Sequence, residues 1–244
     1  MRTESNAAGE SVYGPGVFAA RPLMFILAAL AGCATQIPQK EQGPPVVRSL
    51  TIYEELVRRD PSKRLVDLRD AIPGIVIDIR YATNQNFMKQ PVCNVARPLL
   101  RAPAARVLHA VQQELAKQGL GIKVWDAYRP YRVTKQMWDL IRDPDFVAYP
   151  AKGSRHNRGA AVDLTLVVRA TGRELEMTTG YDEFSPRAHH NYPRVGKRAM
   201  RHRALLREVM ERHGFERFPA EWWHYDFRGW ERFDLMDLSL DEVP

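Results

Sequence analysis

Residues 153–167 read GSRHNRGAAVDLTLV, a polar loop that becomes an apolar run. The apolar part, at about 160–168, predicts a β-strand, because short apolar runs rich in β-branched residues suit a buried strand. Two glycines in the polar part permit a tight loop that can turn His156 toward the start of the strand, which carries Asp163. Taken alone the pair is weak evidence for a metal site, since a loop histidine is usually solvated or hydrogen-bonded.

Other helices and strands are predicted on both sides of this stretch. Helical periodicity and capping residues predict helices at 102–118, 131–142 and 198–213. Alternation predicts strands at 74–81, 121–128 and 222–227. The strands are few and short. An α+β fold is therefore favoured over a doubly wound one, with a small, mostly antiparallel sheet flanked by helices in a single domain.

Residues 1–32 are interpreted as a signal peptide. Their apolar run, PLMFILAALAG, is too short at about ten residues to span a bilayer. It ends in LAGC, which resembles the lipobox of bacterial lipoproteins and predicts a lipid on Cys33. An ordinary secretory signal, or a core helix with a buried cysteine, is the alternative. The expected location is the bacterial cell envelope, lipid-anchored in the periplasm, and Ala34 points to the outer membrane if the cell is Gram-negative.

The stretch after Cys33 is rich in Gln and Pro and lacks periodicity, which is typical of a tether. We assign the tether to 33–55 and the folded domain to 56–244. If Cys33 is lipidated, Cys93 has no partner within the chain, and disulfides contribute nothing to the fold. Stability must then come from the hydrophobic core.

The chain is basic, with a net charge of +7. A basic domain at an envelope surface would be drawn toward anionic lipid or cell-wall polymer, although a solvated basic face explains the charge equally well. The sequence carries no signature of an RNA- or DNA-binding module, so no nucleic-acid partner is expected.

The stretch EWWH, residues 221–224, places a carboxylate and an imidazole three positions apart around two indoles. This arrangement suits a general base and a metal ligand in a water-poor pocket, and aromatic packing on the core is the alternative. Residues i and i+3 point to opposite faces of a regular strand. We therefore expect Glu221 on a turn ahead of the strand that carries His224.

The stretch WDAYRP, residues 125–130, ends a predicted strand with an arginine fixed by the following proline. The guanidinium of Arg129 could stabilise an oxyanion over a reaction site. A simple ion pair with Asp126 at a turn is the alternative.

These motifs together resemble one family, the D-alanyl-D-alanine dipeptidases of the VanX type, within the zinc peptidases that share a hedgehog-like fold. The resemblance spans about residues 75–227. The stretches that carry it, in chain order, are DIRYATNQNF (78–87), WDAYRP, SRHNRGAAVD (154–163), MTTGYDEFSPRAHH (177–190) and EWWH. Five ordered motifs make chance agreement improbable.

The resemblance implies a zinc ion, one per subunit, with His156, Asp163 and His224 as its ligands. It implies that Glu221 is the base that takes a proton from the attacking water and later passes it to the leaving amine. Arg129 would stabilise the tetrahedral oxyanion.

Three further residues match family positions that bind the dipeptide: Tyr81, Ser154 and Asp182, with Asp182 facing the ammonium group. A buried carboxylate at that place would reject substrates whose amine is acylated. The chain departs from the family at Thr178, where glycine is common, and has Gly180 instead. The orientation of the Asp182 side chain therefore depends on the local backbone conformation, which the resemblance does not predict.

The activity implied is zinc-dependent hydrolysis of the free D-alanyl-D-alanine dipeptide, a small-molecule substrate, in cell-wall dipeptide turnover. A peptidoglycan D,D-carboxypeptidase or endopeptidase of the same fold is the alternative, and it would have to accept an acylated amine. A zinc-containing lipoprotein that binds cell-wall peptides without cutting them is a further alternative.

Overall fold

The computed structural model describes residues 43–244. The predicted signal peptide, Cys33 and the first part of the predicted tether lie outside the described residues. The first elements of the described residues are β1 (Val46–Val47) and α1 (Leu50–Arg59), and both begin within the stretch 33–55 assigned to the tether. No helix in the described part of the chain has the length and apolar content needed to cross a membrane.

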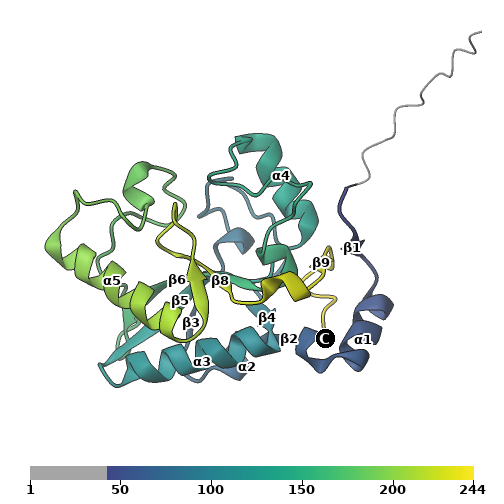
Figure 1. Ribbon diagram of the computed structural model, residues 1–244, viewed down its shortest axis with the longest axis horizontal. Coiled ribbons are helices and arrows are strands. Elements are labelled where there is room, and N and C mark those ends of the chain that lie inside the picture. The colour runs from purple at the N-terminus through teal and green to yellow at the C-terminus, as the bar shows by residue number, and fades with distance from the viewer. Residues whose placement is uncertain (1–42) are drawn as a thin grey trace, which may run out of the picture. The chain divides into compact units, whose positions relative to one another are not determined.

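A mixed sheet of five strands forms the centre of the fold, in the order β3-β5-β6-β8-β7 (Figure 1). Strand β3 is parallel to β5, and the other three ladders are antiparallel. The prediction of an α+β fold with a small, mostly antiparallel sheet is confirmed. The five strands are β3 (Val76–Ile77), β5 (Leu120–Asp126), β6 (Ala161–Val168), β7 (Phe215–Arg217) and β8 (His224–Phe227).

Two short ladders lie outside this sheet. Strand β1 pairs in parallel with β9 (Leu235–Met236), and β2 (Leu65–Asp67) pairs with β4 (Leu99–Arg101) in the antiparallel sense. Each joins segments that are far apart in the chain. The second ladder leads directly into the long helix α3.

One face of the central sheet is apolar and packs against helices. Alternate residues of β6, namely Val162, Leu164 and Leu166, are fully buried in this core. Helices α2 (Leu68–Ala71), α3 (Ala102–Ala116) and α5 (Lys197–Arg212) contribute the other side of it. The intervening residues of β6 point to the opposite face of the sheet, and Asp163 is among them.

A second apolar cluster joins α1, α4 (Tyr131–Ile141) and the C-terminal segment. Tyr128 ties them together, because its hydroxyl donates to the carbonyl of Leu238 at 2.8 Å and accepts from the amide of the same residue at 3.0 Å. Cys93 is buried in this cluster and forms no disulfide with any residue of the described range 43–244. Figure 1 shows α4 and α3 at opposite sides of the sheet strands.

The three predicted helices and the strands predicted at 121–128 and 160–168 are present with ends that shift by at most a few residues. The predicted strand 74–81 is mostly wrong, since β3 has only two residues and a 3-10 turn follows at Arg80–Ala82. The reason lies in Tyr81, whose carbonyl accepts hydrogen bonds from the amides of Val92 and Cys93, both at 2.9 Å. A loop therefore binds the carbonyl group that a neighbouring strand would need for pairing.

Candidate metal centre and pocket

Strand register brings acidic and imidazole side chains into one row across the sheet. Asp126 on β5 is the cross-strand partner of Asp163 on β6, which is in turn the partner of His224 on β8. Residues in register on neighbouring strands point to the same face. The ladder register thus places the three side chains on the face opposite the main core.

His156 completes the group from a 3-10 turn at His156–Arg158. Its Nε2 lies 3.4 Å from Oδ1 of Asp163 and 3.1 Å from Nδ1 of His224. The same Nδ1 lies 3.0 Å from that carboxylate oxygen. The three residues predicted as zinc ligands therefore point one atom each at a common position, and all three are buried or nearly so.

Neighbouring groups contact other polar atoms of His156 and Asp163, so that the three atoms facing the common position can bind a metal. The other ring nitrogen of His156 contacts the carbonyl of Ala127 at 2.7 Å, and the hydroxyl of Tyr181 donates to Oδ2 of Asp163 at 2.9 Å. Oδ1 of Asp163 accepts no well-formed hydrogen bond from any described residue. Two imidazole nitrogens and one carboxylate oxygen are a donor set that catalytic zinc takes in proteins. The residues present therefore fit a zinc ion.

The loop before β6 has the tight form that its glycines predict. Gly153 and Gly159 have φ values of 69° and 64°, and a Cβ on Gly159 would lie 2.5 Å from a methyl carbon of Leu65. Buried Asn157 fixes the loop from inside, since its Oδ1 accepts from the amide of Ser154 at 2.8 Å and its Nδ2 donates to the carbonyl of Arg129 at 2.9 Å. Loop and strand end are thereby held together.

Glu221 lies on a turn directly ahead of β8, as predicted. Its Oε2 is 3.8 Å from Nδ1 of His224, so the carboxyl group borders the position at which the three ligand atoms point. Burial raises the pKa of Glu221 to about 8; His224 opposes this shift, and the negative charges of Asp163 and Asp182 add to it. A carboxyl with such a pKa can both accept and release a proton near neutral pH.

Arg129 forms the ion pair with Asp126 that was one of the two alternatives, and its side chain also lines the pocket. Its Nη1 donates to Oδ2 of Asp126 at 2.8 Å, and its guanidinium lies over the ring of Tyr81 at 5.0 Å. Its Nε is buried without a hydrogen-bond partner among the described residues, and the side chain lines the same pocket as Glu221. Burial works against the charged form, yet Asp126 holds the pKa of Arg129 above its usual range.

Asp182 reaches the same pocket from the loop between β6 and α5. It has a left-handed φ of 58°, and its carboxylate accepts from the hydroxyl of Tyr81 at 3.1 Å and from the amide of Phe87 at 3.3 Å. These contacts aim the group inward although Thr178 replaces the glycine common in the family. Burial, and then the charge of Asp163, raises the pKa of Asp182 to about 7.

The pocket has a cavity volume of about 100 Å³ and opens to solvent. All eight residues predicted for the site line it, and aromatic rings form much of the rest of the wall. The eight are Tyr81, Arg129, Ser154, His156, Asp163, Asp182, Glu221 and His224. The aromatic residues are Phe146, Phe184, Phe218 and Trp223.

Four residues that support these side chains were not predicted for the site. Asp126 and Asp226 border the two histidines, Tyr181 binds Asp163, and Asn157 fixes the loop. The motifs contained a partial signal for Asp126, which stands three positions before Arg129. A similar signal existed for Asp226, which stands two positions after His224 on a predicted strand and so shares its face. The contacts of Tyr181 and Asn157 with other segments are not revealed by sequence spacing.

The chain is similar to known proteins. The Peptidase M15 family, described as D-ala-D-ala dipeptidase, matches residues 61–235. The chain belongs to this family. It is therefore an M15 peptidase with a buried His-Asp-His candidate metal site.

Individual relatives of this M15 peptidase carry the same description. The D-alanyl-D-alanine dipeptidase of Escherichia coli (strain K12) is 36% identical over 162 residues, which cover 66% of this chain and 83% of the relative. That of Enterococcus faecium is 32% identical over 181 residues, covering 66% and 90%. A solved structure of the LD-carboxypeptidase LdcB aligns over 55% of this chain and 61% of its own, with a TM-score of 0.37 and 21% identity.

Proposed function

We propose that this M15 peptidase hydrolyses the free dipeptide D-alanyl-D-alanine, with a zinc ion held by His156, Asp163 and His224. Two observations support the substrate. The relatives at 30% identity or more are named D-alanyl-D-alanine dipeptidases. In addition, the pocket that holds the candidate metal site also holds the carboxylate of Asp182.

Asp182 is the single observation that carries the choice of a free dipeptide. A dipeptide is a zwitterion, and its ammonium group would meet a carboxylate that Tyr81 and the amide of Phe87 already hold in place. An acylated amine carries no charge and would cover that carboxylate without supplying an opposite charge, which is costly where the carboxylate is removed from water. The pocket therefore selects against longer peptidoglycan stems.

The side chains divide the chemical work. When bound, zinc lowers the pKa of a water ligand toward ~7 and polarises the scissile carbonyl. Glu221 takes the proton of the attacking water and returns it to the leaving amine, because its carboxyl borders the ligand atoms. Arg129 offers the oxyanion a buried Nε that has no hydrogen-bond partner within residues 43–244, while its Nη1 donates to Asp126.

Ser154 is the remaining substrate contact in this proposal. Its Oγ accepts from the amide of His156 at 3.2 Å, which leaves the hydroxyl proton free to donate. The side chain lines the pocket next to the ligand loop. A hydroxyl at this place can bind a carbonyl or carboxylate oxygen of the dipeptide.

The test is a comparison of two substrates with the zinc-loaded protein. We expect hydrolysis of free D-Ala-D-Ala and little hydrolysis of an N-acylated tripeptide that ends in D-Ala-D-Ala. Cleavage of the acylated peptide alone would contradict the dipeptidase proposal and support a carboxypeptidase of the same fold. Binding of both without cleavage would indicate a cell-wall-binding protein.

We also propose that the protein works in the cell envelope, in dipeptide turnover, with a lipid anchor on Cys33. The support is the LAGC stretch at the end of a short apolar run, which lies outside the described residues. Metabolic labelling with a fatty acid should mark the wild type and leave Cys33→Ser unmarked. Equal labelling of both proteins would contradict the anchor.

A further inference from the structure

In each imidazole of the candidate metal centre, the ring nitrogen that faces away from the other ligands contacts a different kind of partner. Nδ1 of His156 contacts the main-chain carbonyl of Ala127 at 2.7 Å. Nε2 of His224 contacts Oδ1 of Asp226 at 2.9 Å. The His156 ring is therefore held by a backbone carbonyl at 2.7 Å, with Oδ2 of Asp126 at 3.3 Å from the same nitrogen, whereas the far nitrogen of His224 is held by the Asp226 side chain.

Asp226 lies two residues after His224 on β8, so both side chains point to the same face of the sheet. The register of β8 against β6 sets His224 opposite Asp163, and Asp226 falls on the far side of the imidazole. The ring thus spans the gap between two carboxylates. Asp163 lies at its Nδ1, and Asp226 lies at its Nε2.

The second oxygen of Asp226 has a partner of its own. Oδ2 forms an ion pair with Nε of Arg155 at 3.5 Å, and the guanidinium of Arg155 lies over the ring of Trp230 at 4.6 Å. Asp226 is only 8% exposed. A buried carboxylate with contacts on both oxygens has little freedom to rotate, and it can therefore impose an orientation on the imidazole beside it.

We propose that Asp226 is a positioning residue that holds His224 with Nδ1 toward the metal, and that Arg155 keeps the Asp226 carboxylate in place. The inference rests on the metal site of the proposed function and adds the residue that sets which nitrogen of His224 binds. Asp226 itself is no ligand, since its oxygen meets the ring on the side away from Asp163. Removing such an outer partner typically weakens metal binding by about 10- to 100-fold.

The experiment measures zinc affinity of the metal-free full chain by competition with a chromophoric chelator. We expect Asp226→Ala to weaken zinc binding by about 10- to 100-fold and Asp226→Asn by less, because an amide oxygen still accepts from Nε2 but carries no charge. Arg155→Gln should have a smaller effect in the same direction. The matched control is Glu216→Gln, a half-exposed acid on β7 directly across the ladder from Asp226.

A second readout separates positioning from a general loss of structure. Nitrogen NMR of histidine-labelled, zinc-loaded protein reports which ring nitrogen of His224 carries a proton. We expect the proton on Nε2 in the wild type and a mixture of Nδ1–H and Nε2–H rings in Asp226→Ala. Zinc affinity within twofold of the wild type in both Asp226 variants would overturn the inference while leaving the metal site intact. A wild type that binds no zinc would overturn both.

Discussion

The three candidate metal ligands and Asp182 line one pocket, but different kinds of structure hold them in place. Asp163 and His224 sit on paired strands, and a glycine-bounded loop fixed by Asn157 delivers His156. Asp182 belongs to the loop between β6 and α5, outside the sheet, and its carboxylate is held by contacts from Tyr81 and Phe87. The positions of Asp163 and His224 depend on hydrogen bonds between paired strands, whereas the position of the Asp182 carboxylate depends on two hydrogen bonds from distant residues.

This difference separates chemistry from selectivity. Ligand geometry must be held to within about half an ångström, and rigid elements achieve this better than loops. A charge that recognises an ammonium group tolerates more movement, and loops are where binding groups vary most freely. We therefore expect changes in the strand-borne group to abolish turnover, and changes at Asp182 to alter the choice of substrate.

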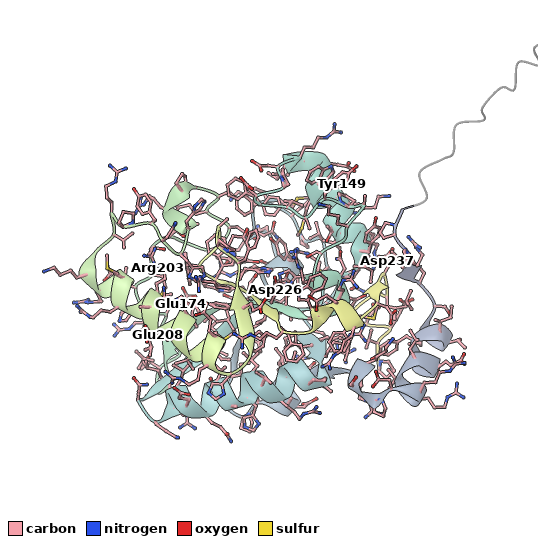
Figure 2. The ribbon with its side chains drawn as sticks, viewed as in Figure 1. Tyr149, Glu174, Arg203, Glu208, Asp226 and Asp237 are labelled. Atoms are coloured by element: carbon pink, nitrogen blue, oxygen red, sulfur yellow. The ribbon has the colours of Figure 1, made fainter. Side chains whose placement is uncertain are left out.

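The largest effect should come from Glu221→Gln, which keeps the shape of the side chain but removes the base. We expect kcat for D-Ala-D-Ala to fall by about 100- to 10,000-fold with zinc content unchanged. Glu208→Gln, on the exposed surface of α5, is the control (Figure 2). Near-normal turnover of the zinc-loaded Glu221 variant would mean that another group moves the proton.

Arg129→Lys should have the next largest effect. Lysine keeps the charge but loses the planar fork that reaches both Asp126 and the pocket, so we expect kcat to fall by about 100-fold with little change in KM. Arg132→Lys, half-exposed three positions further on, is the matched control. A rise in KM at constant kcat would show instead that Arg129 binds the ground state.

Asp182→Asn tests whether the carboxylate on the loop between β6 and α5 controls the choice of substrate. We expect kcat/KM for the free dipeptide to drop by about 30-fold, the equivalent of ~2 kcal/mol, while hydrolysis of an N-acylated substrate is unchanged or improved. Zinc affinity should stay the same. Glu183→Gln, an exposed acid next in the chain, serves as control. An equal loss for both substrates would assign Asp182 to the chemistry rather than to selectivity.

The last prediction concerns the stability of the metal-free protein as pH changes. The pKa of Asp182 is raised from 3.8 to about 7, so the folded chain holds a proton that the unfolded chain releases. Its contribution to stability is therefore complete below pH 3.8 and is lost as pH rises through about 7, with a slope of at most ~1.4 kcal/mol per pH unit.

Urea unfolding from pH 4.5 to 7.5 checks this sign. Glu221 shifts in the same direction, so the difference between wild type and Asp182→Asn isolates Asp182. The variant should lose less stability over this range. Parallel curves for the two proteins would place the Asp182 carboxylate in water rather than in the pocket.

Sequence patterns predicted the long elements well because these elements carry their own signal. Helices α3 and α5 show apolar residues at helical spacing, and β6 is a continuous apolar run. Short elements have no such signal. Strands β1 and β9 have two residues each and form only because they meet. A contact with a distant segment also accounts for the error at 74–81, where the amides of residues 92–93 donate hydrogen bonds to the carbonyl of Tyr81.

The site divides in a similar way. The identities of His156, Asp163, His224 and Glu221 followed from motifs, since a catalytic zinc site admits few residue types and the resemblance ordered them. Even the turn at Glu221 followed from local geometry, because an i, i+3 pair cannot share one face of a strand. Local rules were sufficient wherever the deciding residues lie close together in the chain.

The sequence by itself determined which residue types gather around the pocket and which helices and strands carry them. The tertiary structure decided how the groups are aimed: Nδ1 of His224 toward Asp163, its Nε2 toward Asp226, and the second oxygen of Asp163 toward Tyr181. These orientations depend on strand register and on contacts between distant segments. Such contacts exist only after the chain has folded, and so no spacing in the sequence records them.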